Sequence, residues 1–243
     1  MTTVIAHRGF AGVNPENTVG AVRAATPRAD RVEIDVVACA DGTPVVFHDP
    51  RLDSGPESRG VTDGSGAVAD LSPDAVTAAT VLGSGERVPT LARVCASTTV
   101  PLNVELKHPG REPEPRGSLP PADRAAARER WRPFVDRVLT ALDDRDVRFS
   151  SFYEGALAAV RERDATVPLA PLCVDLSIGS ELAARYDAGT IHPSLAAVRA
   201  ADAVPTDRTV NVWTIRTWHE ACEAVAAGAD GLIADYPGLT QWL

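Results

Sequence analysis

The 243-residue sequence lacks several features that would direct it to particular classes of protein. It has no run of about 18 apolar residues, so we expect no membrane-spanning helix. Positive charge is scarce: 24 Lys and Arg against 33 Asp and Glu give a formal net charge of −9, which argues against nucleic-acid binding. The first residues show no charged segment followed by a long apolar stretch, so we expect no secretory signal.

Cysteine is also sparse, and its spacing excludes the usual frameworks. The four cysteines, Cys39, Cys95, Cys173 and Cys222, lie far apart with no C-x-x-C pair, which favours free thiols over a disulfide frame or a zinc site. With 44% hydrophobic residues, the chain has ample material for a buried core. We therefore expect a soluble cytoplasmic protein.

What the chain does contain is an alternation of short apolar runs and helix-like stretches. We expect strands at 3–6, 31–36, 100–105, 147–150, 167–172, 189–192, 209–213 and 230–233. The intervening helices are expected at 17–25, 88–97, 121–144, 153–164, 180–187, 193–202 and 217–228, the longest with amphipathic spacing from Trp131 to Leu142. Asn17, Ser180 and Ser194 stand at expected helix N-caps, and Gly228 at an expected helix end.

Eight such units in about 240 residues match an α/β fold of the closed (β/α)₈ TIM-barrel type, as a single domain over residues 1–243. A doubly wound open sheet fits less well, because no G-x-G-x-x-G loop follows the first strand. Two segments interrupt this alternation of strands and helices. Residues 41–72 begin with a hairpin turn at Asp41-Gly42, and residues 108–123 are rich in Pro and charge. We expect these extra loops, after strands 2 and 3, on the face that carries the site.

Ionisable residues stand at the ends of the first three strands. The carboxylates of Glu33 and Asp35 lie two residues apart and so share a face, and Glu105 ends the third strand. Because three close carboxylates raise one another's pKa, we expect them to bind one divalent cation, Mg²⁺ or Ca²⁺. The alternative is a surface-facing E-x-D without a metal.

Two histidines supply groups that exchange protons near neutral pH. His7 ends the first strand and His48 follows the second. A phosphodiester needs a base for the attacking hydroxyl and an acid for the leaving alkoxide, and this pair suits both tasks. Arg8 and Lys107 are placed to bind phosphate oxygens. Taken singly, His7 could instead be a core histidine and His48 a capping residue.

These residues carry a family resemblance. The segments AHRGFAGVNPENT, VEIDVVACADGTPVVFHD, VPTL, LNVELK, SSF, VWTIR and GADGLIADYP, in order from Val4 to Pro237, resemble the motifs of the glycerophosphodiester phosphodiesterases. The resemblance implies a TIM barrel that hydrolyses glycerophosphodiesters to glycerol 3-phosphate and an alcohol. It implies acid/base roles for His7 and His48, metal ligation by Glu33, Asp35 and Glu105, and phosphate contacts from Arg8 and Lys107. It further implies that Glu16 orients a ligand or a histidine, and that Phe152 and Trp213 lie near the substrate.

The same resemblance implies that the glycerol hydroxyl of the substrate attacks phosphorus, giving a cyclic phosphate that water opens. The family's Arg-Thr-Thr stretch is replaced here by RLDSGPESRGVTDGSG, and Arg216 stands where an Asn is common. We expect a small water-soluble diester, such as a glycerophosphocholine-like molecule, as substrate, with no stable membrane association. The alternatives are a lysophospholipase D-like or other phospholipase, a non-catalytic phosphate-binding barrel and a partner-binding protein. The sequence leaves open the metal, the order in which the histidines act and the oligomeric state.

Overall fold

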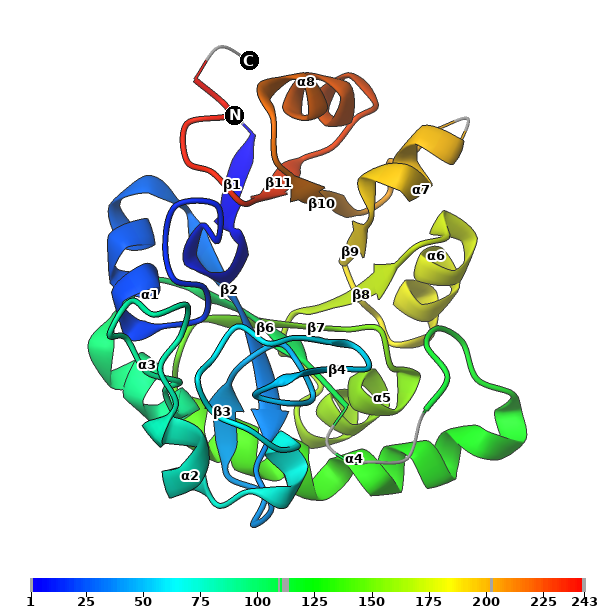
Figure 1. Cartoon of the computed structure of the whole chain (residues 1–243). Coiled ribbons are helices and arrows are strands. Elements are labelled where there is room, and N and C mark those ends of the chain that lie inside the picture. The colour runs from blue at the N-terminus through cyan, green and yellow to red at the C-terminus, as the bar shows by residue number, and fades with distance from the viewer. Residues whose placement is uncertain (1, 109, 111–113, 202, 242–243) are drawn as a thin grey trace.

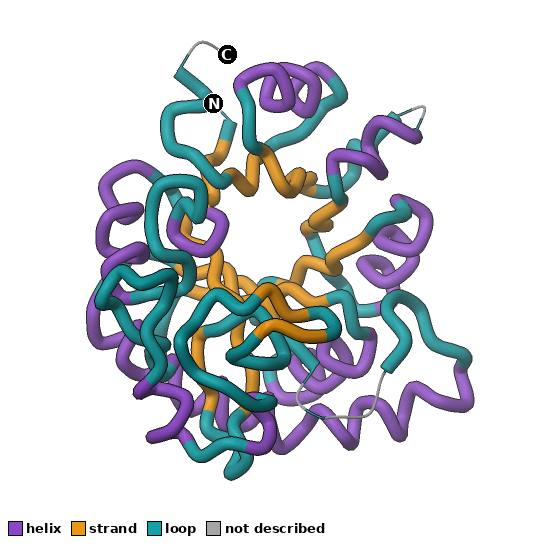
Figure 2. Tube along the Cα trace, in the orientation of Figure 1, coloured by secondary structure: helices purple, strands orange, loops and turns teal. Residues whose placement is uncertain are grey.

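The computed structural model describes residues 2–108, 110, 114–201 and 203–241. Within these ranges, eight parallel strands surround a central axis and helices lie outside them (Figures 1 and 2), which confirms the expected (β/α)₈ barrel. The first strand, β1, pairs with both the second and the last, so the sheet closes and the open-sheet alternative is wrong. The barrel strands are β1 (Thr3–Ala6), β2 (Arg31–Ala38), β6 (Leu102–Leu106), β7 (Val147–Ser151), β8 (Leu169–Cys173), β9 (Thr190–Pro193), β10 (Thr209–Ile215) and β11 (Gly231–Ala234).

The helices between these strands bury one apolar face each against the barrel. They are α1 (Val19–Ala25), α3 (Leu91–Ser97), α4 (Pro121–Leu142), α5 (Glu154–Arg163), α6 (Leu176–Arg185), α7 (Leu195–Ala200) and α8 (Trp218–Ala226), with 3₁₀ turns η1 (His7–Gly9) and η2 (Thr26–Arg28). In α4, the expected amphipathic face is buried from Trp131 to Leu142. Each fully buried apolar side chain of this kind stabilises the fold by about 1.5–3 kcal/mol.

Two of the expected helix ends are confirmed and two are wrong. The Ser194 hydroxyl caps α7, and Gly228 follows α8 with a φ of +100°. Helix α1 is capped by Thr18 rather than Asn17, and α6 begins four residues before Ser180, capped by Asp175. In both cases a second capping residue stands near the predicted one, and tertiary packing selects between them.

The first interrupting segment is folded. Strand β3 (Pro44–Val46) returns antiparallel to β2 through the predicted Asp41-Gly42 turn, where Gly42 has a φ of +84°. It is followed by the hairpin of β4 (Ser54–Gly55) and β5 (Ser58–Arg59), the 3₁₀ turn η3 (Val68–Asp70) and the unpredicted helix α2 (Pro73–Ala78). These elements share a second small core, formed by Val37, Cys39, Val45, Phe47, Leu52, Val68, Val76, Ala79, Val81 and Val88.

The second interrupting segment leads from β6 to α4. Residues 109 and 111–113 of this expected loop lie outside the described residues. Its later part is tied to the barrel, because the Gly117 amide donates to the Phe152 carbonyl at 2.8 Å. Across the described ranges, none of the helices has the length and apolar character needed to cross a membrane.

Candidate active site

The site begins at the tight turn that follows β1. Gly9 has a φ of +77°, and a Cβ placed there would lie 2.8 Å from the Ala21 backbone carbon, so the turn requires glycine. The turn directs the Arg8 amide to Glu33, which accepts its hydrogen bond at 2.8 Å through Oε2. The H-R-G sequence therefore fixes one carboxylate of the second strand through main-chain geometry.

Three carboxylates converge at the mouth of the barrel, as predicted. Glu33 and Asp35 share the inward face of β2, and the parallel register sets Asp35 beside Glu105 of β6. All three are buried, and each offers an oxygen within 4.8 Å of the others. The alternative of a surface-facing E-x-D is wrong.

Two cations and one amide hold Asp35 in place. Its oxygens lie 3.0 Å from Arg8 Nε and 3.2 Å from Lys107 Nζ, and Asn17 Nδ2 donates to it at 2.8 Å. Burial works in the opposite direction, but Arg8 and Lys107 hold the pKa of Asp35 well below its usual range. Lys107 also contacts Glu105 at 2.6 Å. Asn17 was expected to cap a helix; its φ of +59° instead turns its side chain to this carboxylate.

Glu33 is the carboxylate without a cation partner in contact. Its Oε1 atom is buried and has no hydrogen-bond partner. Burial, reinforced by the charges of Asp35 and Glu105, raises the pKa of Glu33 well above its usual range. An orphaned carboxylate oxygen within a cluster of hard oxygen donors fits a divalent cation such as Mg²⁺ or Ca²⁺.

His7 lines the same cavity as Glu33 and Glu105 and contacts an aspartate from the far end of the chain. Its Nδ1 atom lies 2.6 Å from Asp235 Oδ1, and Asp235 Oδ2 accepts from Arg216 Nε at 2.9 Å. Burial lowers the pKa of His7, while the hydrogen bond to Asp235 raises it in part. The net effect lowers the pKa of His7, which favours its neutral form.

His48 lines the same cavity and has a matching arrangement. Its Nδ1 atom lies 2.6 Å from Oδ1 of the neighbouring Asp49. Asp49 is fully buried and also accepts from Arg59, which stands in the β4–β5 hairpin. Burial opposes ionisation of Asp49, but His48 and Arg59 hold its pKa below the usual range. Each of the two expected histidines therefore contacts an aspartate, Asp235 or Asp49, whose role was not predicted from the sequence.

Glu16 contacts two arginines, Arg8 and Arg59, instead of a histidine. Its Oε1 atom accepts from Arg8 at 3.0 Å and from Arg59 at 2.7 Å. Arg8 in turn contacts Asp35, and Arg59 contacts Asp49. Glu16 therefore helps to position Asp35 through Arg8 and Asp49 through Arg59.

Eight of the ten predicted site residues line one small cavity of about 80 Å³: His7, Arg8, Glu33, His48, Glu105, Lys107, Phe152 and Trp213. Asp35 and Glu16 contact members of this set. The rings of Phe152 and Trp213 meet edge to face, with centroids 5.5 Å apart. The cavity continues inward to Asn103, Ser150 and the fully buried His192.

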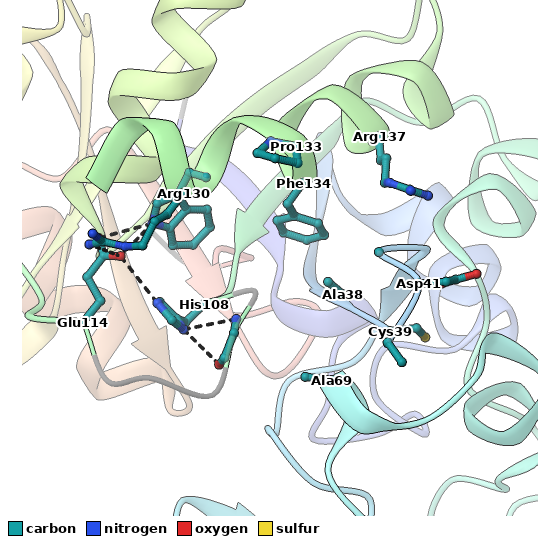
Figure 3. A pocket seen from close by; sticks show the side chains of 14 residues that line it. Ala38, Cys39, Asp41, Ala69, His108, Glu114, Arg130, Pro133, Phe134 and Arg137 are labelled. Carbon is teal, nitrogen blue, oxygen red and sulfur yellow. Dashed lines mark hydrogen bonds and ion pairs between the residues drawn. The ribbon is translucent and has the colours of Figure 1, made fainter. Parts of the chain in front are cut away.

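The two histidines differ in what lies beyond them. His48, Glu105, Lys107 and Phe152 also line a wide hollow of about 740 Å³, whereas His7 does not. A further hollow of about 680 Å³ lies along α4 (Figure 3). Its wall includes Ala38, Ala69 and Phe134, and it shares His108 and Glu114 with the wide hollow.

The chain is similar to one family of known proteins over most of its length. The model of the glycerophosphoryl diester phosphodiesterase family matches residues 7–239. YhdW of Bacillus subtilis is 30% identical over 96% of this chain and 94% of its own length. A glycerophosphodiester phosphodiesterase of Bacillus altitudinis is 26% identical over 98% of this chain and 96% of its own.

Solved structures also share the fold. A phosphodiesterase of Oleispira antarctica, determined in complex with the product sn-glycerol-3-phosphate, superposes with a TM-score of 0.78 at 25% identity. The superposition covers 98% of this chain and 95% of that one.

Proposed function

The chain belongs to the glycerophosphoryl diester phosphodiesterase family and is a phosphoric diester hydrolase, and on this premise we propose a specific reaction and a role for each site residue. The protein hydrolyses glycerophosphodiesters to glycerol 3-phosphate and an alcohol in a reaction that requires a divalent cation, and residues 1–243 act as one domain. The observation that carries this proposal is the convergence of three buried carboxylates at a small cavity that is also lined by two histidines, each of which contacts an aspartate.

Glu33, Asp35 and Glu105 are the residues that would hold the cation, Mg²⁺ or Ca²⁺. The orphaned Oε1 of Glu33 supports this assignment, because a buried carboxylate oxygen without a partner is costly. When bound, the cation supplies Lewis-acid stabilisation of negative charge on phosphoryl and glycerol oxygens. Arg8 and Lys107 add positive charge beside the phosphate, although both also contact Asp35.

His7 acts first as the base and His48 as the acid. His7 lines the small cavity and not the wide hollow, which suits the compact glycerol end of the substrate. His48 also faces the wide hollow, which has room for the varied alcohol. His7 Nε2 takes the proton of the glycerol hydroxyl as its oxygen bonds to phosphorus, and His48 donates a proton to the departing alcohol oxygen.

The product of this step is a cyclic glycerol phosphate. His48, now neutral, takes a proton from water as the water oxygen bonds to phosphorus, and His7 returns its proton to the glycerol oxygen as the ring opens. Asp235 and Asp49 each orient one imidazole and stabilise its protonated form. Phe152 and Trp213 close one wall of the cavity and limit access of bulk water.

A lysophospholipase D-like activity is the second candidate, and the hollow along α4 is the observation that favours it (Figure 3). Its apolar wall could accept an acyl chain. Its rim, however, carries charged side chains, and the shared residues His108 and Glu114 form an ion pair where the two hollows meet. A water-soluble diester therefore fits better.

The cysteines of the described chain are unpaired, which supports action in the reducing cytoplasm.

The test is release of the alcohol from glycerophosphodiesters with and without an acyl chain, in Mg²⁺, in Ca²⁺ and in chelator, since both kinds of substrate yield this product; the acyl-free diesters also yield glycerol 3-phosphate. We expect release from the acyl-free diesters with metal and none with chelator. The same assay compares His7→Ala with His219→Ala, a matched control that changes an exposed histidine on α8. Inactivity in both metals, or activity that persists in chelator, would overturn the proposal.

A further inference from the structure

The wide hollow beside His48 is lined by two arginines whose partners differ. Arg51 and Arg116 both line this hollow. The Arg51 guanidinium is neutralised by Asp53, which accepts from it at 2.8 and 3.1 Å. Arg116, by contrast, forms no ion pair with a carboxylate of the described residues. Within the described part of the chain, Arg116 hydrogen-bonds to the Tyr153 side chain and lies near the charge of Glu57, but no carboxylate pairs with its guanidinium, which can therefore pair with an anion in the hollow.

The chain holds Arg116 at a defined position. The neighbouring Gly117 amide donates to the Phe152 carbonyl at 2.8 Å, which ties this part of the loop to the end of β7. The Arg116 guanidinium carbon lies 5.3 Å from the centroid of the Phe152 ring, as in a cation–π contact. Phe152 also lines the small cavity that contains His7 and His48. Arg116 therefore contacts a residue of the site in which the proposed reaction takes place.

The same contact disfavours a cationic headgroup. A quaternary ammonium is recognised by open aromatic faces, but one face of Phe152 is already covered by Arg116. Trp213 meets the same ring edge to face at 5.5 Å. The remaining carboxylates of the hollow are mostly occupied: Glu105 contacts Lys107, and Glu114 contacts His108. Glu57 is the exposed exception.

We propose that Arg116 selects glycerophosphodiesters whose leaving alcohol carries a negative charge, such as a second phosphate group. This inference rests on the proposed function and names the substrate class of that site. The reacting phosphate lies between the histidines, the alcohol extends past Phe152 into the wide hollow, and its anionic group pairs with the Arg116 guanidinium. Glu57 opposes this preference from the rim.

The experiment compares kcat/KM for three diesters that share the glycerophosphate end. Bis(glycerophospho)glycerol has an anionic leaving alcohol, glycerophosphoglycerol a neutral one and glycerophosphocholine a cationic one. We expect the wild-type protein to prefer the anionic substrate. Arg116→Gln should lower kcat/KM for that substrate at least about fivefold and leave the neutral substrate nearly unchanged. Arg116→Lys should retain part of the preference, since it keeps the charge.

Two further variants serve as controls. Arg28→Gln removes one exposed arginine from η2, beside the amino end of β2 and thus at the opposite end of the barrel, and should leave all three values unchanged. Glu57→Gln should strengthen the preference for the anionic substrate. If glycerophosphoglycerol is hydrolysed but the preference is absent, or Arg116→Gln lowers all three values alike, this inference fails while the proposed function stands. Inactivity on all three diesters would instead refute the proposed function.

Discussion

The two sides of the reaction centre have the same local chemistry and different surroundings. On each side a histidine Nδ1 lies 2.6 Å from an aspartate that an arginine also contacts. On the His7 side the aspartate comes from 228 residues away and the cavity is small. On the His48 side the aspartate is the next residue and a wide hollow adjoins it. The two histidines thus have matching partners, whereas the spaces that adjoin them differ in size.

The largest expected effect comes from removing the histidines. His7→Ala and His48→Ala should each lower kcat by about 10²- to 10⁴-fold on a natural diester. A diester of glycerol phosphate with 4-nitrophenol, whose leaving group needs no proton, separates the two roles. It should restore much of the activity of His48→Ala and little of that of His7→Ala. Equal restoration of both variants would contradict the assignment of acid and base.

The aspartates should have smaller effects that differ in pH dependence. Asp235→Asn and Asp49→Asn should each lower kcat about ten- to a hundredfold, because each imidazole loses the group that orients it. The Asp235 hydrogen bond raises the pKa of His7 against the burial that lowers it. Removing the charge therefore lowers that pKa further, and the acid limb of kcat/KM should move to lower pH.

The pH profile of Asp235→Asn tests this sign. A shift of the acid limb to higher pH, or a loss of activity that follows a lowered melting temperature, would show that Asp235 acts otherwise.

The tight packing of the His7 side should appear in stability. Gly9→Ala places a Cβ 2.8 Å from the Ala21 backbone at a φ of +77° and should cost about 2–4 kcal/mol of unfolding free energy. Gly83→Ala is the control, since Gly83 has a φ of +65° with no atom within 4 Å of the added Cβ. It should cost about 1 kcal/mol. Equal urea midpoints for the two variants would show that the turn relaxes freely.

The smallest effects should come from the outer arginines. The Arg216 side chain is 61% exposed and, among the described residues, its guanidinium pairs with Asp235, so Arg216→Gln should lower kcat only about two- to threefold. Arg59 contacts both Asp49 and Glu16, so Arg59→Gln should lower kcat more, about tenfold. Steady-state rates on one neutral diester suffice to rank them. A larger loss of kcat for Arg216→Gln than for Arg59→Gln would show that the arginine beside Asp235 matters more than the one beside Asp49, contrary to this ranking.

Much of the fold and half of the site chemistry follow from short-range sequence patterns. Strand alternation places Glu33 and Asp35 on one face, and the eight strand runs indicate the barrel. Asp235 could not be assigned a role, because its contact with His7 exists only once β11 closes against β1. Arg59 stands in a Gly- and Ser-rich segment that suggests an irregular loop, and the six-residue α2 is too short to show a helical period.

The metal site is tested most directly by an anomalous difference map from crystals soaked in Mn²⁺, which replaces Mg²⁺ with a detectable ion. We expect one strong peak bounded by Glu33, Asp35 and Glu105 and lying between His7 and His48. A map with no peak among these carboxylates, or with the ion bound outside the histidine pair, would contradict this expectation.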